Sequence, residues 1–231
     1  MVVPTSTAKV SIVIVEDESL YRDLLRIALS EDPALNVVGA FADGTSALKE
    51  IPQLNPQVAV LDIDLGDSIN GIQLGLLLRQ QLPDLGIVLL SNHADPEFLL
   101  AVSGPALIGW SYLLKKSLGD VTTLRRAIQG SAQQLIVLDP LLVAGLKARS
   151  FGLLSRLSPR QQQVLDLIAQ GYTNAGIGEA LSVTEKSVEN QINQLYQVLG
   201  IERGTSGTHP RVKAVLLYLQ GSQTAWHGKT S

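Results

Sequence analysis

Short, unbroken apolar runs rich in β-branched residues recur through the first half of this chain, and helical patterns separate them. The runs are Val10 to Val15, Val37 to Phe41, Val58 to Ile63, Ile87 to Leu90 and Leu107 to Leu114. Helices are expected from Leu20 to Ala28, from Asp43 onward, and at Ile72 to Leu82, Pro96 to Val102 and Val121 to Ile128. Strands that lack polar alternation are buried on both faces, as in a parallel sheet covered by helices. The pattern predicts an α/β unit with five parallel strands, five helices and right-handed crossovers.

Composition narrows the class of protein. With 45% hydrophobic and 17% charged residues among 231, the chain has enough apolar content for a packed core, which excludes an intrinsically disordered protein. The absence of cysteine excludes disulfides and thiolate metal sites. No apolar run reaches the roughly 20 residues that span a bilayer, and the start lacks a signal-peptide pattern. We therefore expect a cytoplasmic protein with no membrane partner.

Polar side chains follow the predicted strands at the points where the strands end. Glu16 and Asp17 follow the first strand, Asp62 ends the third, Ser91 ends the fourth and Lys115 ends the fifth. In an open parallel sheet, ligands bind beyond the carboxyl ends of the strands. Carboxylates from two strands suit Mg²⁺, and a carboxylate beside Mg²⁺ and a lysine can attack phosphorus to form an aspartyl phosphate. The sequence therefore predicts a metal and phosphate site, with Asp62 as the candidate nucleophile.

A less specific interpretation remains open for each of these residues taken singly. Acidic residues after a strand often only solubilise a loop or cap the next helix, and Glu16 to Ser19 precede a helical pattern. Five suitable residue types at successive strand ends are harder to explain by capping alone. The combined pattern favours the site.

Residues 9–130 resemble the receiver domain of response regulators, a flavodoxin-like (βα)5 fold. The motifs that carry the resemblance are Val13-Ile14-Val15-Glu16-Asp17, Val60-Leu61-Asp62-Ile63, Val88-Leu89-Leu90-Ser91 and Tyr112-Leu113-Leu114-Lys115. The resemblance implies that Asp62 is the phosphoacceptor. It also implies that Glu16, Asp17, Asp62 and the backbone carbonyl of Asp64 hold Mg²⁺, and that a sensor histidine kinase supplies the phosphoryl group.

The same resemblance assigns the remaining polar positions. It makes Lys115 a partner of the phosphoryl group, and it makes Ser91 and Tyr112 the hydroxyl and aromatic residues that rearrange on phosphorylation. The segment from Leu65 to Gly71 departs from the family pattern, because it lacks the usual proline and is one residue longer. We expect this loop to alter the kinetics of phosphorylation.

Residues 156–220 contain helical patterns only, which predicts an all-α domain of four helices. Ser158-Pro159 is a strong helix start, and Thr173 and Thr184 precede two later helices as N-caps. The helix after Thr184 has an apolar stripe of Val188, Ile192, Leu195 and Leu199. Residues 131–155 are expected to form a linker with a connector helix, and residues 221–231 a disordered tail.

The opposite side of the helix that follows Thr184 is rich in amides and nearly neutral. The candidate DNA-binding residues on this side and its flanks are Lys186, Ser187, Glu189, Asn190, Asn193 and Gln194. Asparagine and glutamine can read adenine edges in the major groove, where a helix fits. A merely solvated helix face is the alternative for this segment. Near the last helix, Arg203, Arg211 and Lys213 are candidates for phosphate contacts or for an ordinary solvated loop.

This second half resembles the LuxR-type helix-turn-helix. The resemblance is carried by Leu157-Ser158-Pro159-Arg160, Ile168-Ala169-Gln170-Gly171, Thr173-Asn174 and Glu185-Lys186-Ser187-Val188. Together with the receiver it identifies the chain as similar to response regulators of the NarL/FixJ class. It implies that double-stranded promoter DNA is a partner. It also implies that phosphorylation either releases the DNA-binding domain or promotes a homodimer. Glu189 stands where a contacting lysine is frequent, and residues 151–231 carry only 7 basic against 5 acidic side chains.

We therefore expect a two-component transcription regulator, and not an enzyme. The main alternative is a phospho-gated interaction protein whose helix-turn-helix has lost affinity for DNA, as Glu189 and the low basic content suggest. A phosphatase of the haloacid-dehalogenase type is a distant third, because Asp62-Ile63-Asp64 resembles its motif. That motif usually lies on the first strand of the sheet, however, and no long cap insertion is present.

Overall fold

The computed structural model describes residues 9–66, 68–93, 104–147, 154, 156–201 and 209–223. The chain forms two compact units, the first with residues 1–92 and 109–134 and the second with residues 93–108 and 135–231. The helix predicted from Pro96 to Val102 lies outside the described residues, as does Arg203. Among the described residues, no helix is both long and apolar enough to cross a lipid bilayer.

The first unit alternates strands with helices, as the sequence predicts. Its strands are β1 (Val10–Val15), β2 (Leu35–Phe41), β3 (Val58–Asp62), β4 (Gly86–Ser91) and β5 (Trp110–Leu114). Its helices are α1 (Ser19–Ser30), α2 (Gly44–Leu54), α3 (Gly71–Gln81) and α5 (Val121–Ala132). Every residue of β3, β4 and β5 is buried. This burial on both faces explains why these strands have continuous apolar runs instead of alternating patterns.

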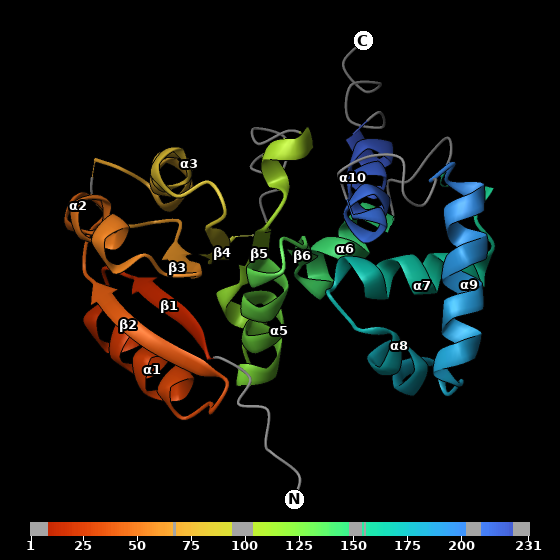
Figure 1. Ribbon diagram of the computed structural model, residues 1–231, viewed down its shortest axis with the longest axis horizontal. Coiled ribbons are helices and arrows are strands. Elements are labelled where there is room, and N and C mark those ends of the chain that lie inside the picture. The colour runs from red at the N-terminus through yellow and green to blue at the C-terminus, as the bar shows by residue number, and fades with distance from the viewer. Residues whose placement is uncertain are drawn as a thin grey trace, which may run out of the picture. The chain divides into compact units, whose positions relative to one another are not determined.

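The strand order β2-β1-β3-β4-β5-β6 includes a sixth strand, β6 (Val137–Leu138), where the sequence predicted five. β6 has only two residues, too short to give a periodic signal. The pairs β1–β2, β1–β3, β3–β4 and β4–β5 are all parallel. Figure 1 shows α1 and α5 on one face of the sheet and α2 and α3 on the other. The predicted helix-covered parallel sheet is confirmed, and its carboxyl edge gathers the ends of β1, β3, β4 and β5.

Close contact between α3 and the end of β3 depends on a glycine. Asn70 caps α3 by accepting a hydrogen bond from the N–H of Gln73, whose side chain accepts in return from the N–H of Asn70. The next residue, Gly71, donates its N–H to the carbonyl of Ile63 at 3.0 Å. A Cβ at Gly71 would overlap the carbonyl oxygen of Asp62. The glycine therefore lets the helix start directly against the backbone of Asp62.

The second unit is helical after β6. Its helices are α6 (Pro140–Lys147), α7 (Pro159–Ala169), α8 (Asn174–Leu181), α9 (Glu185–Val198) and α10 (Pro210–Gln223). The predicted N-caps are present, since Ser158, Thr173 and Thr184 accept hydrogen bonds from the N–H groups of Gln161, Gly176 and Ser187. The predicted stripe of α9 is buried. The all-α four-helix arrangement from α7 to α10 is confirmed.

The connector segment contains a helix, as the sequence predicts. Helix α5 continues to Ala132, and the connector helix α6 packs against α7 and α10. The hydroxyl of Tyr218 on α10 lies 3.2 Å from the carbonyl oxygen of Val143 on α6 and 2.8 Å from Asp166 Oδ1 on α7. The tail was predicted to begin at Gly221, but α10 extends to Gln223.

Replacing Gly71 with alanine tests the close approach of α3 to β3. An alanine inside a helix ordinarily stabilises a protein by about 0.5–1 kcal/mol relative to glycine. At this position we expect the opposite sign, a loss of roughly 1–3 kcal/mol, because the backbone carbonyl of Asp62 cannot move aside easily. Chemical denaturation of the full chain measures the difference. The control is Gly119→Ala, since a Cβ at Gly119 meets nothing within 4 Å. Equal stability of the Gly71→Ala protein and wild type would contradict the predicted clash.

Candidate functional site

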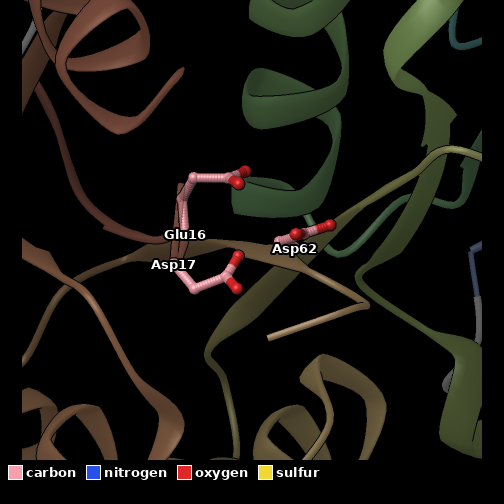
Figure 2. Close-up of side chains that lie close together, drawn as sticks. All are labelled: Glu16, Asp17 and Asp62. Atoms are coloured by element: carbon pink, nitrogen blue, oxygen red, sulfur yellow. The ribbon is translucent and has the colours of Figure 1, made fainter. Parts of the chain in front are cut away.

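Three carboxylates gather at the carboxyl edge of the first unit's sheet. Glu16 and Asp17 directly follow β1, and Asp62 is the last residue of the neighbouring strand β3. One carboxylate oxygen from each lies within 4.8 Å of the others. Figure 2 shows the three side chains close together. Glu16 and Asp62 are buried, whereas Asp17 is exposed at the rim. The structure thus brings together three of the predicted metal ligands in a group able to hold a cation.

Lys115, which follows β5, supplies the positive charge in this cluster. Its Nζ lies 3.0 Å from Glu16 and 3.1 Å from Asp62 Oδ2. The ring of Tyr21 on α1 lies below the ammonium, with its centroid 4.6 Å from Nζ. A buried pair of carboxylates is unfavourable unless a cation compensates it. Lys115 provides that compensation in the described structure.

The ionisation of these groups reflects their burial and proximity. Burial raises the pKa of Glu16 from 4.5 to about 7, against the opposing effect of the hydrogen bond from Lys115. Burial alone would lower the pKa of Lys115, but the Glu16 and Asp62 carboxylates outweigh it and raise this pKa. The cluster is therefore short of positive charge, since one ammonium serves two buried acids.

The first turn of α1 supports the acidic pair. Arg22 Nη1 donates hydrogen bonds to the carbonyl oxygens of Glu16 at 2.6 Å and Asp17 at 3.2 Å. The N-cap residue of α1 is Glu18, and its side chain makes no cap hydrogen bond. The sequence patterns singled out neither Tyr21 nor Arg22. The one feature of the sequence that could have indicated them is their position in the first turn of the helix that follows Glu16 and Asp17.

The loop after β3 lies against the rim of the cluster. Gly66 has a left-handed conformation, with φ of +59°, and a Cβ there would lie 2.9 Å from Asp17 Oδ2. This loop is the segment that departs from the receiver pattern, and its glycine leaves room for the Asp17 carboxylate. The Asp64 residue, expected to contribute its backbone carbonyl, is exposed.

The two residues predicted to rearrange on phosphorylation are both buried. Ser91 ends β4 next to β3 and is 3% exposed, and Tyr112 on β5 is 1% exposed. Tyr112 is paired in register with Leu89 of β4, and Ser91 with Leu114 of β5. Both side chains therefore come from strands that reach the same edge as Asp62.

The six side chains predicted to bind DNA all lie on α9 in the second unit. Lys186, Asn190 and Gln194 are exposed at helical spacing, and Ser187, Glu189 and Asn193 are half-buried beside them. Lys186 Nζ lies 2.8 Å from Glu189 Oε2. This ion pair neutralises the one cation among these six side chains.

Two arginines of the second unit fix helices internally. Arg211 donates to the carbonyl of Tyr172 and to Asn174 Oδ1, both at 2.6 Å, and so holds the start of α8. Arg160 Nε donates to Gln191 Oε1 at 3.2 Å. Arg211 was a candidate for a phosphate contact or for a solvated loop. In the structure its guanidinium is bound by Tyr172, just before α8, and by Asn174, the first residue of α8.

Comparison with known proteins agrees with this geometry. Residues 12–129 match the family described as response regulator receiver domain, and residues 155–206 match the bacterial regulatory proteins of the luxR family. The first match contains all the residues of the acidic cluster and Lys115. The second contains the whole of α9.

Relatives match this chain over most of their length. The DNA-binding transcriptional activator DevR/DosR of Mycobacterium tuberculosis is 32% identical over 202 residues, which cover 85% of this chain and 91% of that protein. The transcriptional regulatory protein DegU of Brevibacillus brevis is 28% identical over 226 residues, 89% of this chain and 94% of that protein. A solved RcsB–DNA complex is similar in fold, with a TM-score of 0.53 and 25% identity over 92% of this chain and 98% of that one. The chain thus belongs to the NarL/FixJ class of response regulators, DNA-binding transcriptional regulators with a receiver domain and a LuxR-type domain.

Proposed function

We propose that Asp62 is the phosphoacceptor of this response regulator and that a sensor histidine kinase supplies the phosphoryl group. The observation that carries the proposal is the buried Asp62 carboxylate with Lys115 Nζ 3.1 Å away and two further acids beside it. A carboxylate oxygen of Asp62 would attack the phosphorus of a phosphohistidine. The P–N bond would break, the histidine would leave, and an acyl phosphate would remain on Asp62.

The residues present fit a magnesium ion at the cluster. Asp62 Oδ1 is buried and accepts no hydrogen bond from the described residues, so it has a lone pair available for a cation. Glu16, Asp17 and Asp62 supply hard oxygen ligands, and the carbonyl of Asp64 is proposed as a fourth. Mg²⁺ would supply charge neutralisation for the incoming phosphoryl oxygens. Lys115 would pair with another phosphoryl oxygen, with Ser91 and Tyr112 responding to the modification.

For the second unit we propose binding to double-stranded promoter DNA through α9. Support comes from the exposed Lys186, Asn190 and Gln194, and from the relatives, one of which is a DNA-binding transcriptional activator. A solved structure of two RcsB dimers on two parallel DNAs, with a TM-score of 0.51 and 25% identity, supports a homodimer. We propose that phosphorylation favours this dimer. Because DNA is the proposed ligand, we also propose a cytoplasmic protein.

We propose that the receiver domain spans residues 9–130, the linker 131–155 and the DNA-binding domain 156–220. A second candidate function keeps the receiver but not the DNA contact: a phospho-gated interaction protein. One observation favours it, the ion pair that ties Lys186 to Glu189 and leaves the face of α9 nearly neutral. Replacement of Glu189, described below, separates the two functions.

Replacing Asp62 with asparagine should abolish phosphorylation. The asparagine side chain has no carboxylate nucleophile, whereas Lys115 and the other acids remain. Both proteins are incubated with acetyl phosphate and Mg²⁺, and the mass of the intact protein is measured by mass spectrometry. The wild type should gain one phosphoryl group, about 80 Da, and the variant should gain none. The control is Asp64→Asn, which keeps the proposed backbone ligand and should still be phosphorylated. Equal modification of Asp62→Asn and wild type would refute the assignment.

Replacing Glu16 with glutamine should change the pH dependence of stability in metal-free solution. Burial raises the pKa of Glu16 from 4.5 to about 7, so the folded protein binds more protons than the unfolded chain between these values. Wild type should therefore lose stability relative to Glu16→Gln as pH rises through this window, by up to about 3 kcal/mol. Denaturation curves in EDTA from pH 4 to pH 8 measure the difference. Glu50→Gln, an exposed control on α2, should run parallel to wild type; a parallel Glu16→Gln curve would contradict the prediction.

Replacing Glu189 with glutamine should strengthen DNA binding if α9 enters the major groove. The change releases Lys186 from its ion pair and removes a negative charge that repels phosphates. We expect affinity to rise roughly 3- to 10-fold at low salt, with the salt dependence steeper by about one phosphate contact. Fluorescence anisotropy across salt concentrations measures both. Glu50→Gln changes net charge equally in the first unit and serves as control. Absence of DNA binding by all three proteins would favour the interaction protein instead.

A further inference from the structure

We propose that Arg22 is a positioning residue for the metal site: it holds the backbone from which the Glu16 and Asp17 carboxylates project. The inference rests on the proposed function, because it concerns the proposed Mg²⁺ site. It adds a residue outside the acidic cluster, on the helix that follows it. Arg22 would act through the two acids and would not itself contact the cation.

The hydrogen bonds of Arg22 span the whole turn that carries the acids. Its side chain donates to the carbonyl oxygens of Glu16 and Asp17, and its own backbone N–H donates to the carbonyl of Glu18 at 2.9 Å. Three consecutive carbonyl groups thus receive hydrogen bonds from one residue. The turn lies beyond the end of β1, so its carbonyls have left the strand ladder that fixes the preceding residues.

The two sides of the turn are fixed by different means. On the sheet side, the N–H of Glu16 donates to the carbonyl of Phe41 on β2 at 3.1 Å. On the helix side, Arg22 binds the carbonyls. Gly66 lies beside the Asp17 carboxylate, and a Cβ at this position would come within 2.9 Å of Asp17 Oδ2. Loss of the Arg22 bonds would therefore release the turn on its helix side and let the two carboxylates move apart.

Charge and geometry make opposite predictions for Arg22, which makes the inference testable. A guanidinium close to an acidic cluster repels a divalent cation, so the electrostatic effect of removing it is tighter metal binding. If Arg22 instead orients the ligands, its removal weakens metal binding. Replacing a group that supports the ligands of a metal site typically lowers the affinity for the metal by roughly 10- to 100-fold. The sign of the change thus separates the two roles.

The experiment is titration of the full-length protein with MgCl₂ alone, followed by isothermal calorimetry. The variants are Arg22→Met, which removes the charge and the donors, and Arg22→Lys, which retains both in shorter form. Arg26→Met is the matched control, since Arg26 lies one turn further along α1 and its Nη2 pairs only at 3.5 Å with the exposed Asp23. Circular dichroism and thermal melting establish that each variant is folded.

We expect the dissociation constant for Mg²⁺ to rise roughly tenfold in Arg22→Met. Arg22→Lys should recover most of the affinity, and Arg26→Met should bind as wild type or slightly more tightly. Unchanged or tighter binding by folded Arg22→Met would overturn the inference while leaving the proposed metal site intact. If Arg22→Met does not fold, Arg22→Gln replaces it and is judged by the same sign. Failure of wild type itself to bind Mg²⁺ would overturn the metal site, and the inference with it.

Discussion

The ion pairs of Lys115 with Glu16 and Asp62 are the interaction on which the first unit's site depends. Two carboxylates that are almost completely buried lie side by side at the edge of the sheet, and a single ammonium 3.0 and 3.1 Å away faces both. Moving a charged group from water into the protein interior costs roughly several kcal/mol per ion. Only a closely placed partner of opposite charge with good geometry offsets this cost. The arrangement remains short of one positive charge, and burial accordingly raises the pKa of Glu16. A site in this state favours ligands that bring positive charge.

The backbone around this cluster is packed closely enough to hold it in place. Gly71 brings the start of α3 against the carbonyl of Asp62, and Gly66 lies against the carboxylate of Asp17. Arg22 binds the turn between β1 and α1 from the helix side. Rigid support of this kind matters because phosphoryl transfer depends mainly on positioning and on charge stabilisation. The site is thus built from the strand ends together with three supports that lie outside the acidic group.

In the described part of the second unit, three basic side chains are bound within the protein. Arg211 holds the start of α8, Arg160 contacts Gln191 on α9, and Lys186 is paired with Glu189. The face that a helix-turn-helix would present to DNA therefore has amides and few free cations. Because phosphate contacts supply much of the affinity for DNA, such a face would rely more on base contacts and on dimer formation.

The amino-acid sequence was enough to predict the alternation of strands and helices, the class of the first unit and the members of the acidic cluster. Short apolar runs rich in β-branched residues indicate strands buried on both faces. Because the carboxyl ends of parallel strands meet at one edge, Glu16, Asp17, Asp62 and Lys115 could be expected to converge. The N-caps Ser158, Thr173 and Thr184 were equally predictable, because capping is a local interaction between residues two or three positions apart.

Contacts between distant segments leave no local signal in the sequence, and they became visible only in the folded chain. The two-residue β6 is too short for any periodicity, and the placement of Arg22 against the Glu16 and Asp17 carbonyls depends on the angle at which α1 leaves β1. Arg211 reaches α8 across 37 residues of chain. A long, flexible side chain has many possible partners in a sequence, and it acquires one only when packing fixes the backbones on both sides.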